Sequence, residues 1–155
     1  MFGGRHPFED IRQNVVNHLN YEPSHRKERT FRDGLRNRLS QNGYKVAVEY
    51  DPSRDLNIQP NYCRVDLEVQ FGRRHPNVAI EAKENFGQHS REDIKRLRNE
   101  IQKYMEFWDY IIVCTNGFRN QDYQREWNNL RAEFETSGGM FSQQEIDFIP
   151  KPQLL

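Results

Sequence analysis

Long apolar runs are missing from this sequence, and cysteine is scarce. No segment approaches the roughly 18 consecutive apolar residues that a membrane-spanning helix needs, and the first residues, Met1 to Arg5, lack the apolar stretch of a signal peptide. The two cysteines, Cys63 and Cys114, both lie in strand-like apolar segments. We therefore predict a cytoplasmic protein without membrane association, in which both thiols are reduced and buried rather than joined in a structural disulfide.

An excess of charge of either sign is also absent, since 23 basic residues balance 23 acidic ones. This balance gives no global support for nucleic-acid binding, but the distribution is uneven. Seven basic and only two acidic residues lie between Ser24 and Lys45. Such a run is more often a solvated helix face than a binding surface. The five histidines show no zinc-like spacing with the cysteines, and no glycine-rich phosphate loop or serine or cysteine nucleophile motif is present.

The length of 155 residues and an aromatic content of 12% suffice for one domain with a real core. Apolar spacing predicts helices over about 8–20, from Ser24 or His25 to Gln41, from about Ser90 through Trp108, and around Tyr123 to Phe134. Strands are expected over 44–50, 63–71, 78–83, 110–115 and 145–149, with 51–61 a loop. The first three strands should form an antiparallel meander. The fourth, continuously apolar, should be central, and the last is a candidate edge strand.

Alternation along the strands assigns their side chains to two faces. In the first strand it places Val46, Val48 and Tyr50 together, and in the second it places the odd-numbered residues from Cys63 to Phe71 together, opposite Asp66. In the third strand Glu81 and Lys83 should project together beside Ala79, with the apolar neighbours on the other face. The order α, α, β, β, β, α, β, α, β predicts an α/β domain with a mixed sheet flanked by helices.

One constellation of charged residues could carry chemistry. If the second and third strands form a hairpin, Asp66 comes within reach of Glu81, and two carboxylates and the Lys83 amine converge inside a sheet. Burying these charges is costly unless a cation compensates them. Mg²⁺ (or Mn²⁺) prefers such oxygen ligands, to which the Ala82 carbonyl could add a third.

Such a site fits phosphodiester hydrolysis. The metal would activate a water, while Lys83 would orient or deprotonate that water, or donate to the developing negative charge. The alternative without chemistry is an exposed Glu81–Lys83 ion pair on an edge strand, which would contribute little to stability. We favour the site, because Ala-Ile-Glu-Ala-Lys is apolar around its charges, as a buried strand would be.

The segments Arg64-Val65-Asp66-Leu67 and Ala79-Ile80-Glu81-Ala82-Lys83, with 14 residues between Asp66 and Glu81, resemble the motif pair of the PD-(D/E)XK nuclease superfamily. Val65 stands in place of the proline of that name. The resemblance implies a restriction-endonuclease-like αβββαβ core. On this basis the chain, 1–155, is a single nuclease-like domain with an N-terminal helical extension (1–23), a core (24–117) and a C-terminal helix and strand (118–155).

The resemblance also suggests auxiliary site residues. Lys27-Glu28-Arg29 is similar to the helix start in archaeal Holliday-junction resolvases, which implies Glu28 as a further metal ligand and catalytic residue. Glu49 on the first strand is the alternative third carboxylate. Gln102-Lys103-Tyr104 and Thr115-Asn116-Gly117 are similar to the segments that follow the lysine in the nuclease domain of type I restriction enzyme motor subunits. This implies Gln102 as a possible site residue, whereas Tyr104 is expected to pack in the core.

The resulting hypothesis is a Mg²⁺-dependent endonuclease, a hydrolase that acts on DNA in restriction, phage defence or repair, as a homodimer or a subunit of a larger nuclease complex. Its phosphate contacts would come from basic residues near the site: Arg26, Lys27, Arg29, Arg32, Arg36, Arg73 and Arg74, together with the Lys95–Arg98 segment. The rival from another class is a non-catalytic nucleic-acid-binding or assembly subunit that keeps the nuclease fold. The zero net charge favours the rival mildly, whereas the intact Asp66, Glu81 and Lys83 favour the enzyme.

Overall fold

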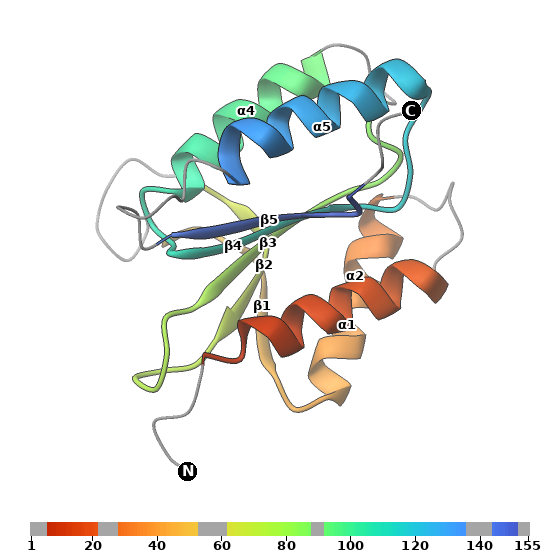
Figure 1. Cartoon of the computed structure of the whole chain (residues 1–155). Helices are drawn as coiled ribbons and strands as arrows, with labels where there is room; N and C mark the ends of the chain where they lie inside the picture. The colour runs from red at the N-terminus through yellow and green to blue at the C-terminus, as the bar shows by residue number, and fades with distance from the viewer. Residues whose placement is uncertain (1–5, 22–27, 53–61, 88–91, 136–143, 152–155) are drawn as a thin grey trace.

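A five-stranded mixed sheet separates two layers of helices in the computed structural model (Figure 1). The structure describes residues 6–21, 28–52, 62–87, 92–135 and 144–151. Figure 1 shows α4 and α5 on one face of the sheet and α1 and α2 on the other. The described residues thus form an α/β fold with four helices around a mixed sheet, as the sequence predicts.

The order of helices and strands is also the predicted one, and three of the five strands begin and end at the predicted residues. The helices are α1 (Phe8–Tyr21), α2 (Glu28–Gln41), α4 (Glu92–Tyr104) and α5 (Gln121–Glu135). The strands are β1 (Lys45–Tyr50), β2 (Val65–Gln70), β3 (Val78–Lys83), β4 (Tyr110–Thr115) and β5 (Glu145–Ile149). The third helix is shorter than predicted. It ends at Tyr104, and Met105 and Trp108 follow in a turn closed by backbone hydrogen bonds to Ile101 and Tyr104.

The strands lie in the order β1-β2-β3-β4-β5. β1, β2 and β3 pair antiparallel as the predicted meander, and β3, β4 and β5 pair parallel. Each parallel pair requires a crossover, which α4 and α5 supply. β4 is an inner strand with five of its six residues buried, and β5 is an edge strand, both as expected.

Two hydrophobic clusters fill the spaces between the sheet and the helix layers. The cluster under α1 and α2 includes Phe31, Leu35 and Leu39, whose helical spacing gives α2 its apolar stripe. The cluster under α4 and α5 includes Leu97, Ile101, Trp127 and Leu130. Val78, Ile80 and Ala82 of β3 belong to the first cluster, whereas Ala79 belongs to the second. The side chains of Glu81 and Lys83 therefore lie on the α4 side of the sheet.

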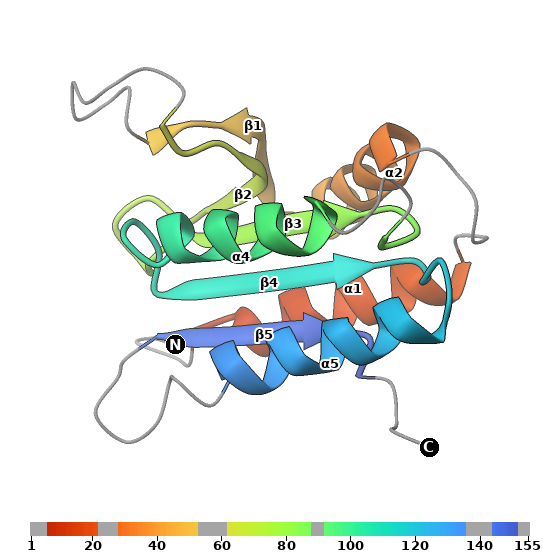
Figure 2. The same cartoon turned by 90° about the horizontal axis from the view of Figure 1, so that it is seen from above.

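The predicted assignment of side chains to the two faces of the sheet is wrong at one end of the β1–β2 pair. Val48 and Leu67 pack in the α1–α2 cluster, but Tyr50 and Val65, which are paired with each other, pack against the α4–α5 cluster. The change occurs at Glu49, whose φ of +52° is in the left-handed region. The two-stranded ribbon therefore turns over near Glu49, and Figure 2 shows it curling away from the plane of β3, β4 and β5.

Both cysteines are free and buried, Cys63 in the α4–α5 cluster and Cys114 in the α1–α2 cluster, which confirms the prediction of separate thiols. They lie in different layers, so the sheet separates them. Within the ranges that the structure describes, no helix combines the length and apolar character that crossing a membrane requires.

Candidate functional site

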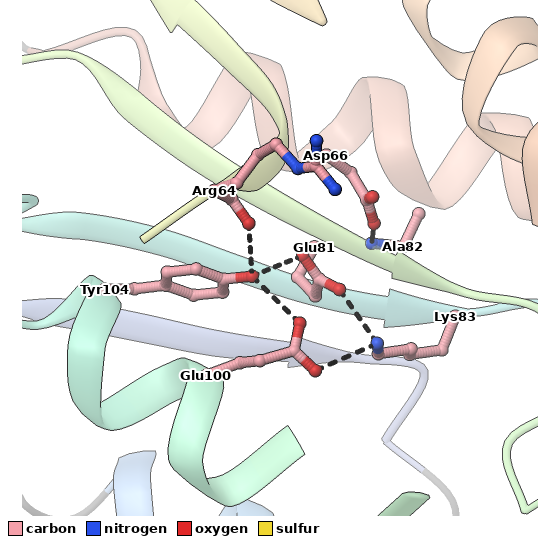
Figure 3. A network of polar contacts seen from close by, with 7 residues as sticks. All are labelled: Arg64, Asp66, Glu81, Ala82, Lys83, Glu100 and Tyr104. Carbon is pink, nitrogen blue, oxygen red and sulfur yellow. Dashed lines mark hydrogen bonds and ion pairs between the residues drawn. The ribbon is translucent and has the colours of Figure 1, made fainter. Parts of the chain in front are cut away.

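Glu81 and Lys83 form the centre of the candidate site, on the α4 side of β3 (Figure 3). Lys83 Nζ lies 2.9 Å from Glu81 Oε2, and the two side chains are 17% and 3% exposed. This is the shared face that the i, i+2 spacing predicts. β3 is an inner strand, and α4 covers this face of the sheet. The pair is therefore not the exposed ion pair of an edge strand.

Two residues of α4 complete a buried polar network around this pair. Lys83 Nζ also lies 3.2 Å from Glu100 Oε1. The Tyr104 hydroxyl lies 2.7 Å from Glu81 Oε1, 3.1 Å from Glu100 Oε2 and 3.2 Å from the Arg64 carbonyl oxygen. The hydroxyl has one proton, and Glu81 Oε1 is its closest acceptor. Spacing of four residues places Glu100 and Tyr104 on the same face of the helix, so one helix turn provides both partners.

Asp66 reaches the same stretch of β3 from β2, through the backbone. The described β2–β3 pairing ends at Leu67 and Ile80, and beyond it the Asp66 carboxylate accepts a hydrogen bond of 2.8 Å from the Ala82 amide. The carboxylate thus takes the place of a strand carbonyl as the partner of that amide. Figure 3 shows Asp66 against Ala82, with Glu81, Lys83, Glu100 and Tyr104 grouped beside it.

The electrostatics of the network reflect two carboxylates buried in a small volume. The pKa of Glu81 is raised to about 7 by burial and then by the negative charge of Asp66, against the opposing effects of Lys83 and Tyr104. The pKa of Glu100 is likewise raised to about 7, by burial and then by Glu81. Burial, followed by the charges of Glu81 and Glu100, raises the pKa of Tyr104 far above its ordinary value. The site therefore has an excess of buried negative charge, which a cation would relieve.

The donor set suits a hard divalent cation in its chemistry. Asp66, Glu81 and the Ala82 carbonyl offer only oxygen, and Mg²⁺ commonly uses one or two carboxylates together with waters and phosphate oxygens. Among the described residues, no group of three or more histidine, cysteine, aspartate or glutamate side chains is arranged to hold a metal ion. Both oxygens of Glu81 carry hydrogen bonds, to Tyr104 and to Lys83, so a cation at Glu81 would compete with the Lys83 ammonium.

The structure does not bring the other predicted carboxylate and amide into this network. Glu49 is exposed and pairs with Arg32, with 3.2 Å between Arg32 Nη1 and Glu49 Oε1. Gln102 is exposed on α4, so the prediction that it lies at the site is not supported by its position. Tyr104 is buried, as expected, but its hydroxyl is part of the site.

The predicted phosphate contacts are only partly described. Arg26 and Lys27 lie outside the described residues, and of Glu28 and Arg29 only the helical backbone in the first turn of α2 is described. Arg32 is half-buried and pairs with Asp33 as well as with Glu49. Arg36 on α2 and Arg73 and Arg74 in the β2–β3 turn are exposed, as a contact with DNA would require.

Sequence reasoning missed Glu100 and the buried Glu68. Glu100 lies between Leu97 and Tyr104 on the buried face of α4, and a charged residue on such a face indicates a buried partner. Glu68 is 3% exposed and accepts a 2.7 Å hydrogen bond from the Trp108 indole. Alternation along β2 places Glu68 on the face opposite Leu67 and Val69, and that face is covered as well.

Comparison of this chain with protein-family models, with curated proteins and with solved structures finds no match.

Proposed function

We propose that this chain is a divalent-metal-dependent endonuclease that hydrolyses phosphodiester bonds of DNA, built on a restriction-endonuclease-like core. The observation that supports the proposal is that the Asp66 carboxylate binds the Ala82 amide, between the paired residues Glu81 and Lys83, at adjacent ends of β2 and β3. The order of elements from α2 to β4, αβββαβ, supports the same assignment of the core. A lysine buried with more carboxylates than it can neutralise is costly in a purely structural role.

In this proposal Asp66 and Glu81 hold the metal, and the Ala82 carbonyl is available as a further oxygen. The bound ion would supply a water of lowered pKa and a positive charge beside the scissile phosphate. The protein's own contribution is to fix two carboxylates on neighbouring strands, where backbone pairing limits their movement. Asp66 is held by the Ala82 amide and Glu81 by the Tyr104 hydroxyl.

Lys83 acts in this account as a donor to the phosphate. Its ion pairs with Glu81 and Glu100 favour the charged ammonium form. An ammonium donates hydrogen bonds and cannot accept a proton, so charge stabilisation fits the geometry better than proton abstraction from water. Exchange of the Glu81 contact for a phosphate oxygen would aim this charge at the reacting group, while Glu100 keeps the side chain in place.

The wider setting follows from the same proposal. DNA would be the substrate, and the exposed Arg36, Arg73 and Arg74 are available to its backbone. Action on both strands would require two sites, hence a homodimer or a larger nuclease complex, in the cytoplasm. Roles in restriction, phage defence or repair come from the resemblance of the motifs alone.

Plasmid nicking with Mg²⁺ and with Mn²⁺ tests the activity. We expect the wild type to convert supercoiled DNA to nicked and linear forms, and Asp66→Asn and Lys83→Met to be slower by on the order of 100-fold or more. Lys103→Met is the matched control for Lys83, because Lys103 is an exposed lysine on α4, and it should retain full activity. Equal rates in all four proteins, or no metal-dependent cleavage by the wild type, would leave the non-catalytic subunit as the better account.

A further inference from the structure

A basic pocket lies between the first turns of α4 and α5, apart from the Glu81–Lys83 network. It has a volume of about 660 Å³, and its lining includes four basic side chains, Lys95, Arg98, Arg119 and Arg125, and two acidic ones, Asp122 and Glu126. Ile94 and Tyr123 contribute apolar surface. The excess of positive charge in a concave site favours an anion.

Two of the four basic side chains are available to a ligand. Arg98 forms an ion pair with Glu133, with 3.1 Å between Nη2 and Oε2. Arg125 forms one with Asp122, with 3.7 Å between Nη1 and Oδ1. Lys95 and Arg119 are exposed, and neither forms an ion pair with any residue in the described part of the chain. The Arg119 guanidinium lies 5.9 Å from the centre of the Tyr123 ring, which holds it over the pocket wall.

The backbone at the start of α5 contributes less. The Asn120 side chain already accepts hydrogen bonds from the amides of Asp122 and Tyr123, at 3.0 and 3.2 Å. These amides are therefore occupied by the helix cap. An anion in the pocket would be bound by the Lys95 and Arg119 side chains rather than by the helix terminus.

The pocket is anchored to the segment that follows Lys83. The Arg119 amide donates to the Phe86 carbonyl oxygen at 2.9 Å, and Phe86 follows Lys83 by three residues. Three residues of extended chain span at most about 11 Å, so the Phe86 backbone is close to the candidate site. Tyr123 packs edge-on against Phe86, and its ring also lies against Gly87, where any Cβ would be 2.2 Å from the ring.

We propose that this pocket binds a backbone phosphate of the DNA, beside the phosphate that is cleaved, with Lys95 and Arg119 as its ligands. The inference rests on the proposed nuclease function and adds a substrate-positioning site to it. The segment after Lys83 leads from the candidate site past the ends of β3 and β4, where Phe86 and Phe118 form a bridge. A DNA strand that leaves the candidate site in this direction would reach the pocket. The pocket lies at this end of the sheet, and its Lys95 and Arg119, which form no ion pair with the described residues, are available to bind a phosphate.

The test measures binding of the full chain to a labelled DNA duplex in EDTA, over a series of salt concentrations. The pocket variant is Lys95→Gln with Arg119→Gln, both at exposed positions, and thermal unfolding should confirm that it folds. The matched control is Lys45→Gln with Lys103→Gln. It also removes two exposed cations, one on β1 and one on α4, and both lie outside the pocket lining. Plasmid cleavage is measured in parallel.

The slope of log K against log salt is negative, and we expect its magnitude to decrease by about one in the pocket variant, which corresponds to one lost phosphate contact, and to remain unchanged in the control. An unchanged slope in the pocket variant, an equal decrease in the control, or no binding by the wild type would overturn the pocket. The two proposals separate in this experiment. Wild-type cleavage with an unchanged slope removes only the pocket, whereas a decreased slope without any cleavage removes only the nuclease.

Discussion

The Tyr104 hydroxyl donates a 2.7 Å hydrogen bond to Glu81, linking α4 to β3 in the interior of the protein. Glu81 is only 2% exposed, so this hydroxyl replaces water as a partner of its carboxylate. Together with Lys83 it determines the orientation of the side chain on which the proposed metal site depends.

Replacement of Tyr104 by phenylalanine should therefore lower the stability of the folded protein. A hydrogen bond to a charged group contributes about 1.5–3 kcal/mol, so Tyr104→Phe should lower the free energy of unfolding by an amount in this range. Tyr62→Phe is the matched control, because the Tyr62 hydroxyl also donates to a glutamate, Glu106, at 2.7 Å, but in an exposed position. Urea unfolding of both variants measures the difference. Equal losses would contradict a special role for the buried contact.

Stability should decrease as the pH rises. The pKa values of Glu81 and Glu100 are each raised to about 7, so the folded state binds these protons more tightly than the unfolded chain does. A raised carboxyl pKa makes the free energy of unfolding fall between the ordinary value, near 4.5, and about 7, and level off above that. Urea unfolding at several pH values from 4.5 to 8, without divalent metal, measures the decrease.

The variant Glu100→Gln should make this pH dependence shallower, because one of the two groups no longer titrates. Asp109→Asn, which alters an exposed carboxylate, should leave the dependence as in the wild type. A wild-type stability that rises from pH 5 to pH 7 would show that the two carboxyl groups do not have raised pKa values.

Both the backbone conformation at Gly87 and the neighbouring Tyr123 ring disfavour any larger residue at this position. Its φ is +93°, and a Cβ would be 2.2 Å from the Tyr123 ring. Gly87→Ala should lower the free energy of unfolding by about 3 kcal/mol or more, the sum of left-handed strain and overpacking. Gly43→Ala is the matched control. Gly43 has a φ of +91° but nothing within 4 Å of the added atom, so the cost should be about 1 kcal/mol.

Thermal or urea unfolding distinguishes these two glycine variants. Similar losses would mean that Tyr123 moves aside without cost. In that case the close packing between the segment after Lys83 and the basic pocket would contribute little to stability.

Local patterns were sufficient to predict most of the fold. The continuous apolar run of β4 follows from the burial of both faces of that strand. The shared face of Glu81 and Lys83 in β3 follows from the two-residue period of a strand. Helical spacing of apolar residues likewise predicted α2, whose Phe31, Leu35 and Leu39 are buried. These features repeat along the chain and need no knowledge of distant contacts.

The features that local patterns missed depend on three-dimensional context. The left-handed φ of Glu49 turns the β1–β2 ribbon over, and alternation alone carries no signal for a residue that departs from the β region. Glu100 was missed because its partners, Glu81 and Lys83, come from a strand and not from its own helix. The sequence predicted that Asp66 lies near Glu81. Its hydrogen bond to the Ala82 amide was not predicted, because it depends on where the β2–β3 pairing ends.

The claim that Asp66 and Glu81 hold a divalent cation can be tested most directly by calorimetric titration of Mn²⁺. The account predicts saturable binding to the wild type, loss of that binding in Asp66→Asn and in Glu81→Gln, and unchanged binding in Glu49→Gln, which alters an exposed carboxylate paired with Arg32. Identical titrations of the wild type, Asp66→Asn and Glu81→Gln would contradict it.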